Sequence, residues 1–129
     1  MRLDVMPANV IIFFGSFNAA IAILLGAFAA HSLKTSVSEY NLDIFKTAAD
    51  FQLWHGLGLI LLGLIAKQYQ QYTYKLITYL FIIGIALFSG SLYLLSITDI
   101  KILGAITPVG GISLITAWCL LSYKMLTVS

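Results

Sequence analysis

Residues 76–97 read LITYLFIIGIALFSGSLYLLSI, a run without a single charged side chain. A helix needs roughly 20 apolar residues to cross about 30 Å of hydrocarbon. Only helices and closed barrels satisfy their backbone polar groups in lipid, and this run is continuously apolar where a barrel strand would alternate. The stretch therefore predicts a membrane-spanning helix.

Three further stretches have the same character: Ala8–Ala30, Phe51–Ala66 and Gly104–Leu126. Of the 129 residues 60% are hydrophobic and 9% are charged, whereas a soluble domain carries about 25% charged residues. We therefore predict an all-α integral membrane protein, a four-helix transmembrane bundle with short loops. It forms a single domain over residues 1–129, with helices at about 8–31, 38–67, 75–97 and 104–126.

The second helix is expected to begin well before its apolar part. Ser36 and Glu39 have the spacing of a capping box. After them, apolar and charged residues recur at helical spacing on different sides, which predicts an amphipathic, interfacial extension. In the last helix, Pro108 is expected to lie in the first turns and to bend the helix there.

Four crossings place both chain ends on one side of the membrane. Lysine and arginine divide four to three in favour of that side, with Arg2, Lys67, Lys75 and Lys124 against Lys34, Lys46 and Lys101. The positive-inside rule then predicts cytoplasmic termini in the plasma membrane. The first stretch is too long for the 7–15-residue core of a signal peptide, so we expect it to be retained.

Small residues form a face on the first helix. Such faces let helices approach closely in lipid, and they predict tight packing within the chain or a homo-oligomer. Asn18 lies close to this face and is placed to hydrogen-bond a neighbouring helix. The predicted packing residues lie on the first, third and fourth helices and are Gly15, Ala19, Ala22, Gly26, Gly90 and Gly111.

Polar residues within the apolar stretches fall toward the side of the first and third loops. Polar groups at such depth face the bundle interior and mark functional pathways, although the same groups also serve only to tie helices together. The candidate polar pocket consists of His31, Gln52, His55, Ser89, Tyr93 and Thr107. Histidine exchanges protons near neutral pH, so a proton or ligand role and a structural role both stay open.

Other chemistry finds little support. Two histidines and Cys119, which lies near the opposite end of the bundle, make a poor metal site. The stretches hold no deep acid pair, phosphate-binding loop or nucleophilic serine motif. Seven scattered lysine and arginine residues and a net charge of +2 do not indicate nucleic-acid binding. We expect no catalytic residues, no metal, no cofactor and no enzymatic activity.

Four local strings occur together in order: GAFAAHSLK at residues 26–34, QLWHGL at 52–57, FSGSLY at 88–93 and GAITPVGG at 104–111. Together they resemble the YgdD/YwdK-like family of small bacterial inner-membrane proteins. The resemblance runs from about Gly15 to Leu121. It implies a four-helix, membrane-embedded protein without an established activity, and it supplies no catalytic residues.

Two functional hypotheses follow. The first is a non-enzymatic, membrane-embedded binding or accessory protein, with the lipid bilayer, a second copy of the chain, or a lipid or small apolar ligand as partners. The alternative is a small transporter or channel that uses a cluster of His31, Gln52 and His55.

Overall fold

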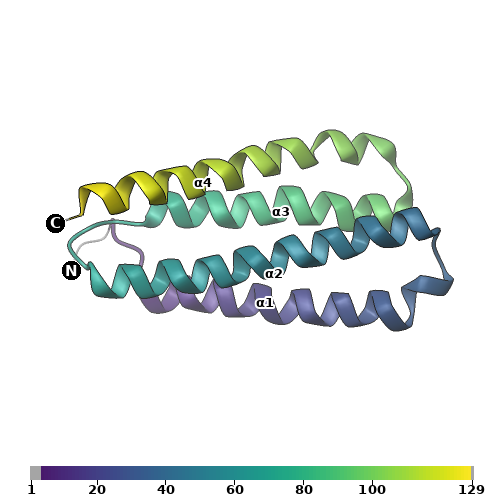
Figure 1. The fold of residues 1–129 in the computed structure, drawn as a ribbon, viewed down its shortest axis with the longest axis horizontal. Coiled ribbons are helices and arrows are strands. Elements are labelled where there is room, and N and C mark those ends of the chain that lie inside the picture. The colour runs from purple at the N-terminus through teal and green to yellow at the C-terminus, as the bar shows by residue number, and fades with distance from the viewer. Residues whose placement is uncertain (1–3, 129) are drawn as a thin grey trace.

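The computed structural model describes residues 4–128, and all of their regular structure is helical (Figure 1). Four long helices follow one another with short connections, and two short 3₁₀ turns lie between them. The elements are α1 (Ala8–His31), η1 (Leu33–Thr35), α2 (Glu39–Gln68), α3 (Lys75–Thr98), η2 (Lys101–Ala105) and α4 (Thr107–Thr127). Each long helix is long and apolar enough to cross a membrane.

The extension of α2 is confirmed, but its capping residue is not the one that the sequence indicated. Ser38 caps the helix, and its side chain accepts a hydrogen bond from the Asn41 N–H at 3.1 Å. Ser36 instead closes η1, where its N–H bonds the Leu33 carbonyl. Glu39 is thus the first helical residue, which is too early for a capping box with Ser36.

The turn between α3 and α4 departs from a simple loop. Asp99 ends α3 in the left-handed conformation, at φ 57°, which aspartate tolerates better than most residues. The chain then forms η2, and α4 begins at Thr107 with Pro108 in its first turn. Proline has no N–H to lose at this position, so α4 accommodates Pro108 in its first turn, where the sequence predicted it.

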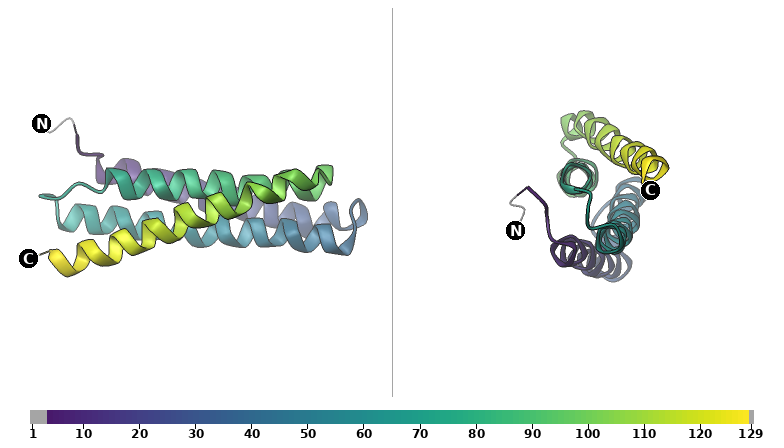
Figure 2. Two further views of the ribbon diagram at one scale, coloured as in Figure 1. Left: turned by 90° about the horizontal axis from the view of Figure 1, so that it is seen from above. Right: turned by 90° about the vertical axis from the view of Figure 1, so that its left-hand side faces the viewer.

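The helices pack in chain order, with α2 and α3 at the centre. In Figure 1, α1 lies against α2 and α4 lies against α3. Seen from one end, α1 and α4 stand on opposite sides of the central pair (Figure 2). Burial follows this order, because half of the α2 span is buried within the protein but only 17% of the α1 and α4 spans.

Glycines bring α1 and α2 into backbone contact. A Cβ added at Gly15 would lie 2.6 Å from the Gly56 carbonyl oxygen and 2.7 Å from the Ile60 nitrogen. A Cβ at Gly56 would lie 3.0 Å from the Ala19 nitrogen, and Ala22 is buried further along the same face. In contrast, nothing lies within 4 Å of a Cβ built at Gly26.

A second close approach joins α3 and α4. It lies at Gly110, where an added Cβ would run into the Phe88 backbone nitrogen. At the neighbouring Gly111 the added Cβ meets only the Phe88 ring, at 3.7 Å, and at Gly90 it meets nothing within 4 Å.

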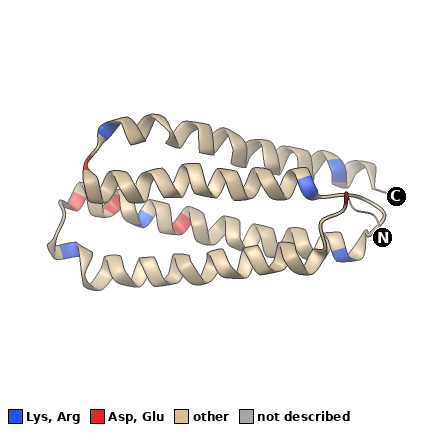
Figure 3. Cartoon of the chain, turned by 180° about the vertical axis from the view of Figure 1, so that it is seen from behind, with Lys and Arg blue, Asp and Glu red and all other residues tan. Residues whose placement is uncertain are grey.

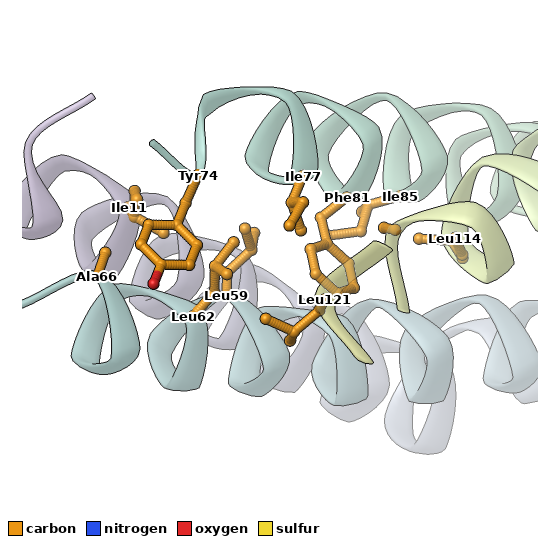
Figure 4. Close-up of a cluster of buried hydrophobic side chains, with 11 residues drawn as sticks. Ile11, Leu59, Leu62, Ala66, Tyr74, Ile77, Phe81, Ile85, Leu114 and Leu121 are labelled. Atoms are coloured by element: carbon orange, nitrogen blue, oxygen red, sulfur yellow. The ribbon is translucent and has the colours of Figure 1, made fainter. Parts of the chain in front are cut away.

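Serine hydroxyls fasten α3 to α2 by bonding backbone carbonyls across the interface. Ser89 donates to the Ala48 oxygen at 2.8 Å, and Ser96 donates to the Asn41 oxygen at 2.6 Å. Beyond them, toward the end where α1 begins and α4 ends, apolar side chains from all four helices form the main core (Figure 4). Phe81, Leu59 and Leu62 are fully buried there.

Charged residues lie mostly toward the two ends of the bundle, and Lys46 and Asp50, the eighth and twelfth residues of α2, lie further in (Figure 3). Among the described residues, the end that holds the start of α1 carries three lysines and one acid, Asp4. The opposite end, including the first turns of α2, carries three lysines and four acids. The apolar flanks between these ends match a bilayer, because many large hydrophobic side chains are exposed there.

Candidate functional site

Three polar side chains from three different helices form a continuous hydrogen-bonded chain within the bundle. The Tyr93 hydroxyl on α3 donates to the Gln52 side-chain oxygen on α2 at 2.7 Å. The Gln52 amide nitrogen donates to the Asn18 side-chain oxygen on α1 at 3.1 Å. Asn18 in turn donates to the Phe14 carbonyl oxygen of its own helix at 2.9 Å. We call Asn18, Gln52 and Tyr93 the polar relay.

The local sequence explains why the relay is held firmly. Asn18 lies near the middle of α1, between Gly15 and Ala22 on the face that packs against α2. The close approach at Gly15 and Gly56 brings α1 near enough for Asn18 to reach Gln52. Gln52 is only 7% exposed, and a buried amide in hydrocarbon is strongly favoured to find such partners.

A groove of about 290 Å³ lies over the relay, between α1 and α3. Gln52, Asn18 and Ser89 supply its polar surface, and α2 forms its floor. The remaining lining is apolar and comes from Phe14, Phe17, Ile82, Ile85, Ala86 and Gly90. We call this the α1–α3 groove. It opens on the flank of the bundle near the middle of α1, since Asn18 is ten residues into this 24-residue helix.

The relay leaves hydrogen-bonding capacity at the groove. Each side-chain amide has two N–H donors and an oxygen with two lone pairs. Within residues 4–128, one N–H of Asn18 and one N–H of Gln52 are used, and neither second N–H has a protein acceptor. An apolar molecule with a hydrogen-bond acceptor would complement these groups.

His55 is held on a different side of α2. Its Nδ1 lies 2.7 Å from the Phe51 carbonyl oxygen, so that nitrogen carries the proton and donates it. The ring is 7% exposed and lies 6.0 Å from both the Phe81 and Trp118 rings, measured between centroids. It therefore faces α3 and α4 and belongs to an aromatic cluster, whereas Gln52 faces α1 and α3.

The six residues of the candidate polar pocket do not gather in one place. Gln52, Ser89 and Tyr93 lie together at or beside the α1–α3 groove. Thr107 joins the first turn of α4 to α3 through a 2.7 Å hydrogen bond with Ser91.

His31 is exposed at the last turn of α1. Glu39 begins α2 close to that end of α1, and His55 lies 16 residues further along α2, or about 24 Å. The two histidines therefore do not form one cluster.

Sequence reasoning predicted that Asn18 hydrogen-bonds a neighbouring helix, as it does with Gln52, but it did not include Asn18 in the candidate polar pocket. The apolar lining of the groove gave no signal, because Phe14 or Ile82 looks like any other lipid-facing residue. Within residues 4–128, no three histidine, cysteine, aspartate or glutamate side chains come close enough to hold a metal ion.

The fold and these contacts define a small four-helix integral membrane protein. The chain belongs to the family described as "Protein of unknown function (DUF423)", whose profile matches residues 25–111. The resemblance seen in the sequence is thereby confirmed.

Relatives at similar identity cover nearly the whole chain. A UPF0382 membrane protein of Staphylococcus saprophyticus is 41% identical over 113 residues, which is 88% of this chain and 93% of the relative. A second from Staphylococcus epidermidis is 42% identical over 113 residues, covering 88% and 92%. The UPF0382 membrane protein YwdK of Bacillus subtilis is 40% identical over 114 residues, covering 88% and 93%. No solved structure matches the chain.

Proposed function

We propose that this protein is a non-enzymatic, membrane-embedded binding protein, and that the α1–α3 groove holds its ligand. The observation that carries the proposal is the buried Gln52 amide, which lies near the middle of α2 beside a groove of about 290 Å³ and has one N–H without a protein acceptor in residues 4–128. Polar groups at this depth are costly unless they are bonded.

The chemistry of the groove indicates the class of ligand. Its walls are phenylalanine, isoleucine, alanine and glycine, which favour an apolar body. The Asn18 and Gln52 amides offer N–H groups, which favour a carbonyl or another uncharged acceptor on that body. Among the described residues, no lysine, arginine or carboxylate lines the groove, so a charged ligand would be left unpaired. An alkyl or prenyl chain that carries a carbonyl head, as in a quinone, fits these requirements.

Native mass spectrometry of the full chain in mild detergent, with decylubiquinone added as the probe, tests the proposal. We expect one retained probe per chain for the wild type and for Gln70→Leu, which makes the same chemical change at an exposed loop position. Gln52→Leu removes the amide and should weaken retention about fivefold, the equivalent of one net hydrogen bond. Equal retention by both variants would contradict the proposal.

A second variant guards against loss of folding in Gln52→Leu. Ala86 is exposed in the wall of the groove and takes no part in the relay. Ala86→Phe should fill the groove, leave the relay intact and prevent probe retention. Unchanged retention in Ala86→Phe would exclude the α1–α3 groove as the site. The same spectra report whether the chain is a homo-oligomer, which we propose as an accompanying property.

We also propose that both termini face the cytoplasm in a bacterial inner membrane. The end of the bundle that holds the termini carries three described lysines, and Arg2 lies in the same terminal segment of the sequence, against three lysines toward the opposite end (Figure 3). A green fluorescent protein fused to the C-terminus should fluoresce, and an alkaline phosphatase fused there should be inactive. The reverse pair of results would invert the orientation.

A further inference from the structure

A second pocket, separate from the α1–α3 groove, lies between α3 and α4 at the end of the bundle where the termini lie. Its volume is about 290 Å³. Its rim comes from the α2–α3 loop and the last turns of α4, where Tyr72, Tyr123 and Lys124 stand, and its floor is apolar. The last turn of a spanning helix places this pocket at the membrane–water interface, where tyrosine is typically enriched.

Lys124 gives the pocket a positive charge, and none of the described acidic side chains forms an ion pair with it. Its Nζ donates to the Thr73 carbonyl oxygen at 2.8 Å. It also lies 5.8 Å from the Tyr72 ring centre and 5.2 Å from the Tyr74 ring centre, within the range of cation–π attraction. Within residues 4–128, no carboxylate lies within ion-pair distance of this ammonium group. Two of its three N–H donors are therefore left for an anion.

The floor of the pocket continues from this charge onto the lipid-facing flank. Leu76 is 63% exposed and Tyr123 is 69% exposed, with the half-buried Leu120 between α3 and α4. The pocket is thus amphipathic along its length, with a cation at the interface and apolar side chains on the bilayer side. This polarity is that of a single phospholipid, an anionic head followed by an acyl chain.

The charge of the whole end agrees with such an occupant. Lys67, Lys75 and Lys124 are opposed there by Asp4 alone among the described residues (Figure 3). Basic residues attract anionic lipids by about 1 kcal/mol when the charges lie close together, and the attraction falls off within a screening length of about 10 Å.

We propose that the α3–α4 pocket is a binding site for an acidic phospholipid of the leaflet on the side of the termini. The Lys124 ammonium pairs with the lipid phosphate, and the Tyr72 and Tyr123 rings flank the headgroup. The first part of an acyl chain lies over Leu76 and Leu120. This site is independent of the ligand proposed for the α1–α3 groove.

Native mass spectrometry with stepwise addition of palmitoyl-oleoyl phosphatidylglycerol tests the site, with palmitoyl-oleoyl phosphatidylcholine as the zwitterionic reference. Lys124→Gln should weaken phosphatidylglycerol binding about fivefold. It should weaken phosphatidylcholine binding less, because the choline cation of that lipid already offsets the charge of its phosphate. Lys67→Gln removes the same charge at the same end of the bundle but outside the pocket, and its binding should stay within about twofold of the wild type. An equal loss of phosphatidylglycerol binding in both variants would mean that the lipid is attracted by the overall charge of this end and not by a specific site. That result would overturn the proposal.

Two further measurements separate the remaining possibilities. Leu76→Trp keeps Lys124 but fills the apolar part of the pocket, so it should also weaken phosphatidylglycerol binding. If Lys124→Gln does not fold, the Leu76→Trp result decides, and unchanged binding there would overturn the site. Inorganic phosphate should not displace the bound lipid. Displacement at millimolar phosphate would show a site for free anions and would contradict a lipid.

Discussion

At the scale of single residues, the hydroxyl of Tyr93 is the part of the polar relay that is easiest to remove alone. Tyr93→Phe deletes its 2.7 Å bond to Gln52 and leaves the Gln52 oxygen without that donor. We expect the free energy of unfolding in detergent to fall by about 1 kcal/mol, measured by thermal or denaturant melts. Tyr79→Phe, at an exposed position of the same helix, should change it little. A neutral Tyr93→Phe would show that the relay is not formed.

For Tyr74 we predict the opposite effect on stability when its hydroxyl is removed. Its hydroxyl is buried and has no hydrogen-bond partner within residues 4–128, so Tyr74→Phe should raise stability by up to about 1 kcal/mol.

Burial, and then the nearby Tyr69 and Tyr72, raise the pKa of Tyr74 above its usual value. Because the unfolded chain then loses this proton first, stability should fall as the pH rises above about 10. Tyr74→Phe should lessen that fall in melts compared between pH 8 and pH 11. An identical loss in both proteins would contradict the assignment.

Residue positions also show where sequence reasoning reached its limit. Gln52 and His55 are three residues apart, so their side chains point about 60° apart around the helix axis. The sequence places both on one face. In the bundle, that 60° spans the boundary between the α1 side and the α4 side, because α2 packs against neighbours in several directions. No spacing within α2 could reveal where its neighbours would stand.

At the scale of the element, two serines lie near the start of α2, and only Ser38 caps the helix. Ser38→Ala removes the side-chain bond to the Asn41 N–H and should cost about 1 kcal/mol of stability. It should also speed hydrogen exchange in the first turn of α2. Ser36→Ala, which removes the residue with capping-box spacing, should do neither. The reverse outcome would restore Ser36 as the cap.

Two glycines of α1, Gly15 and Gly26, allow the same substitution to be compared at a close helix contact and at an open position. Gly15→Ala forces a Cβ against the backbone of Gly56 and Ile60, which has no flexible end to move, and should destabilise the fold by about 1–3 kcal/mol. Gly26→Ala points into open space and should be neutral or stabilising by up to about 1 kcal/mol. Melts of both variants in one detergent provide the test. Equal losses would argue against the α1–α2 approach.

The sequence predicted the stripe of small residues on α1, but it did not show how far along α1 this stripe would contact α2. Figure 1 shows α1 and α2 separating toward η1. There the buried Leu33 and Phe45, with Ala29, form a second small core. Larger side chains fill the wider gap, so Gly26 no longer marks a close approach. A crossing angle between helices is a property of the pair, and one stripe does not contain it.

At the scale of the whole molecule, lipid accounts for how much of the fold could be predicted. The bilayer fixes the length and the hydrogen bonding of each span. The sequence therefore predicted four spanning helices along the chain, and this prediction is confirmed. Lipid also makes exterior and interior equally apolar. For this reason the sequence could not distinguish the wall of the α1–α3 groove from the outer flank. Only the rare polar residues, Gln52 and Tyr93 among them, pointed inward.

The central claim is that the Gln52 amide meets a carbonyl-bearing apolar molecule in the α1–α3 groove. Nuclear magnetic resonance of protein labelled with ¹⁵N only in glutamine side chains tests it directly, with Gln52→Leu identifying the Gln52 signals. On titration with decylubiquinone, we predict that the Gln52 amide signals shift and that the shift saturates. The signals of Gln68, Gln70 and Gln71 should not move. Gln52 signals that stay in place, or that move together with all the others, would contradict the account.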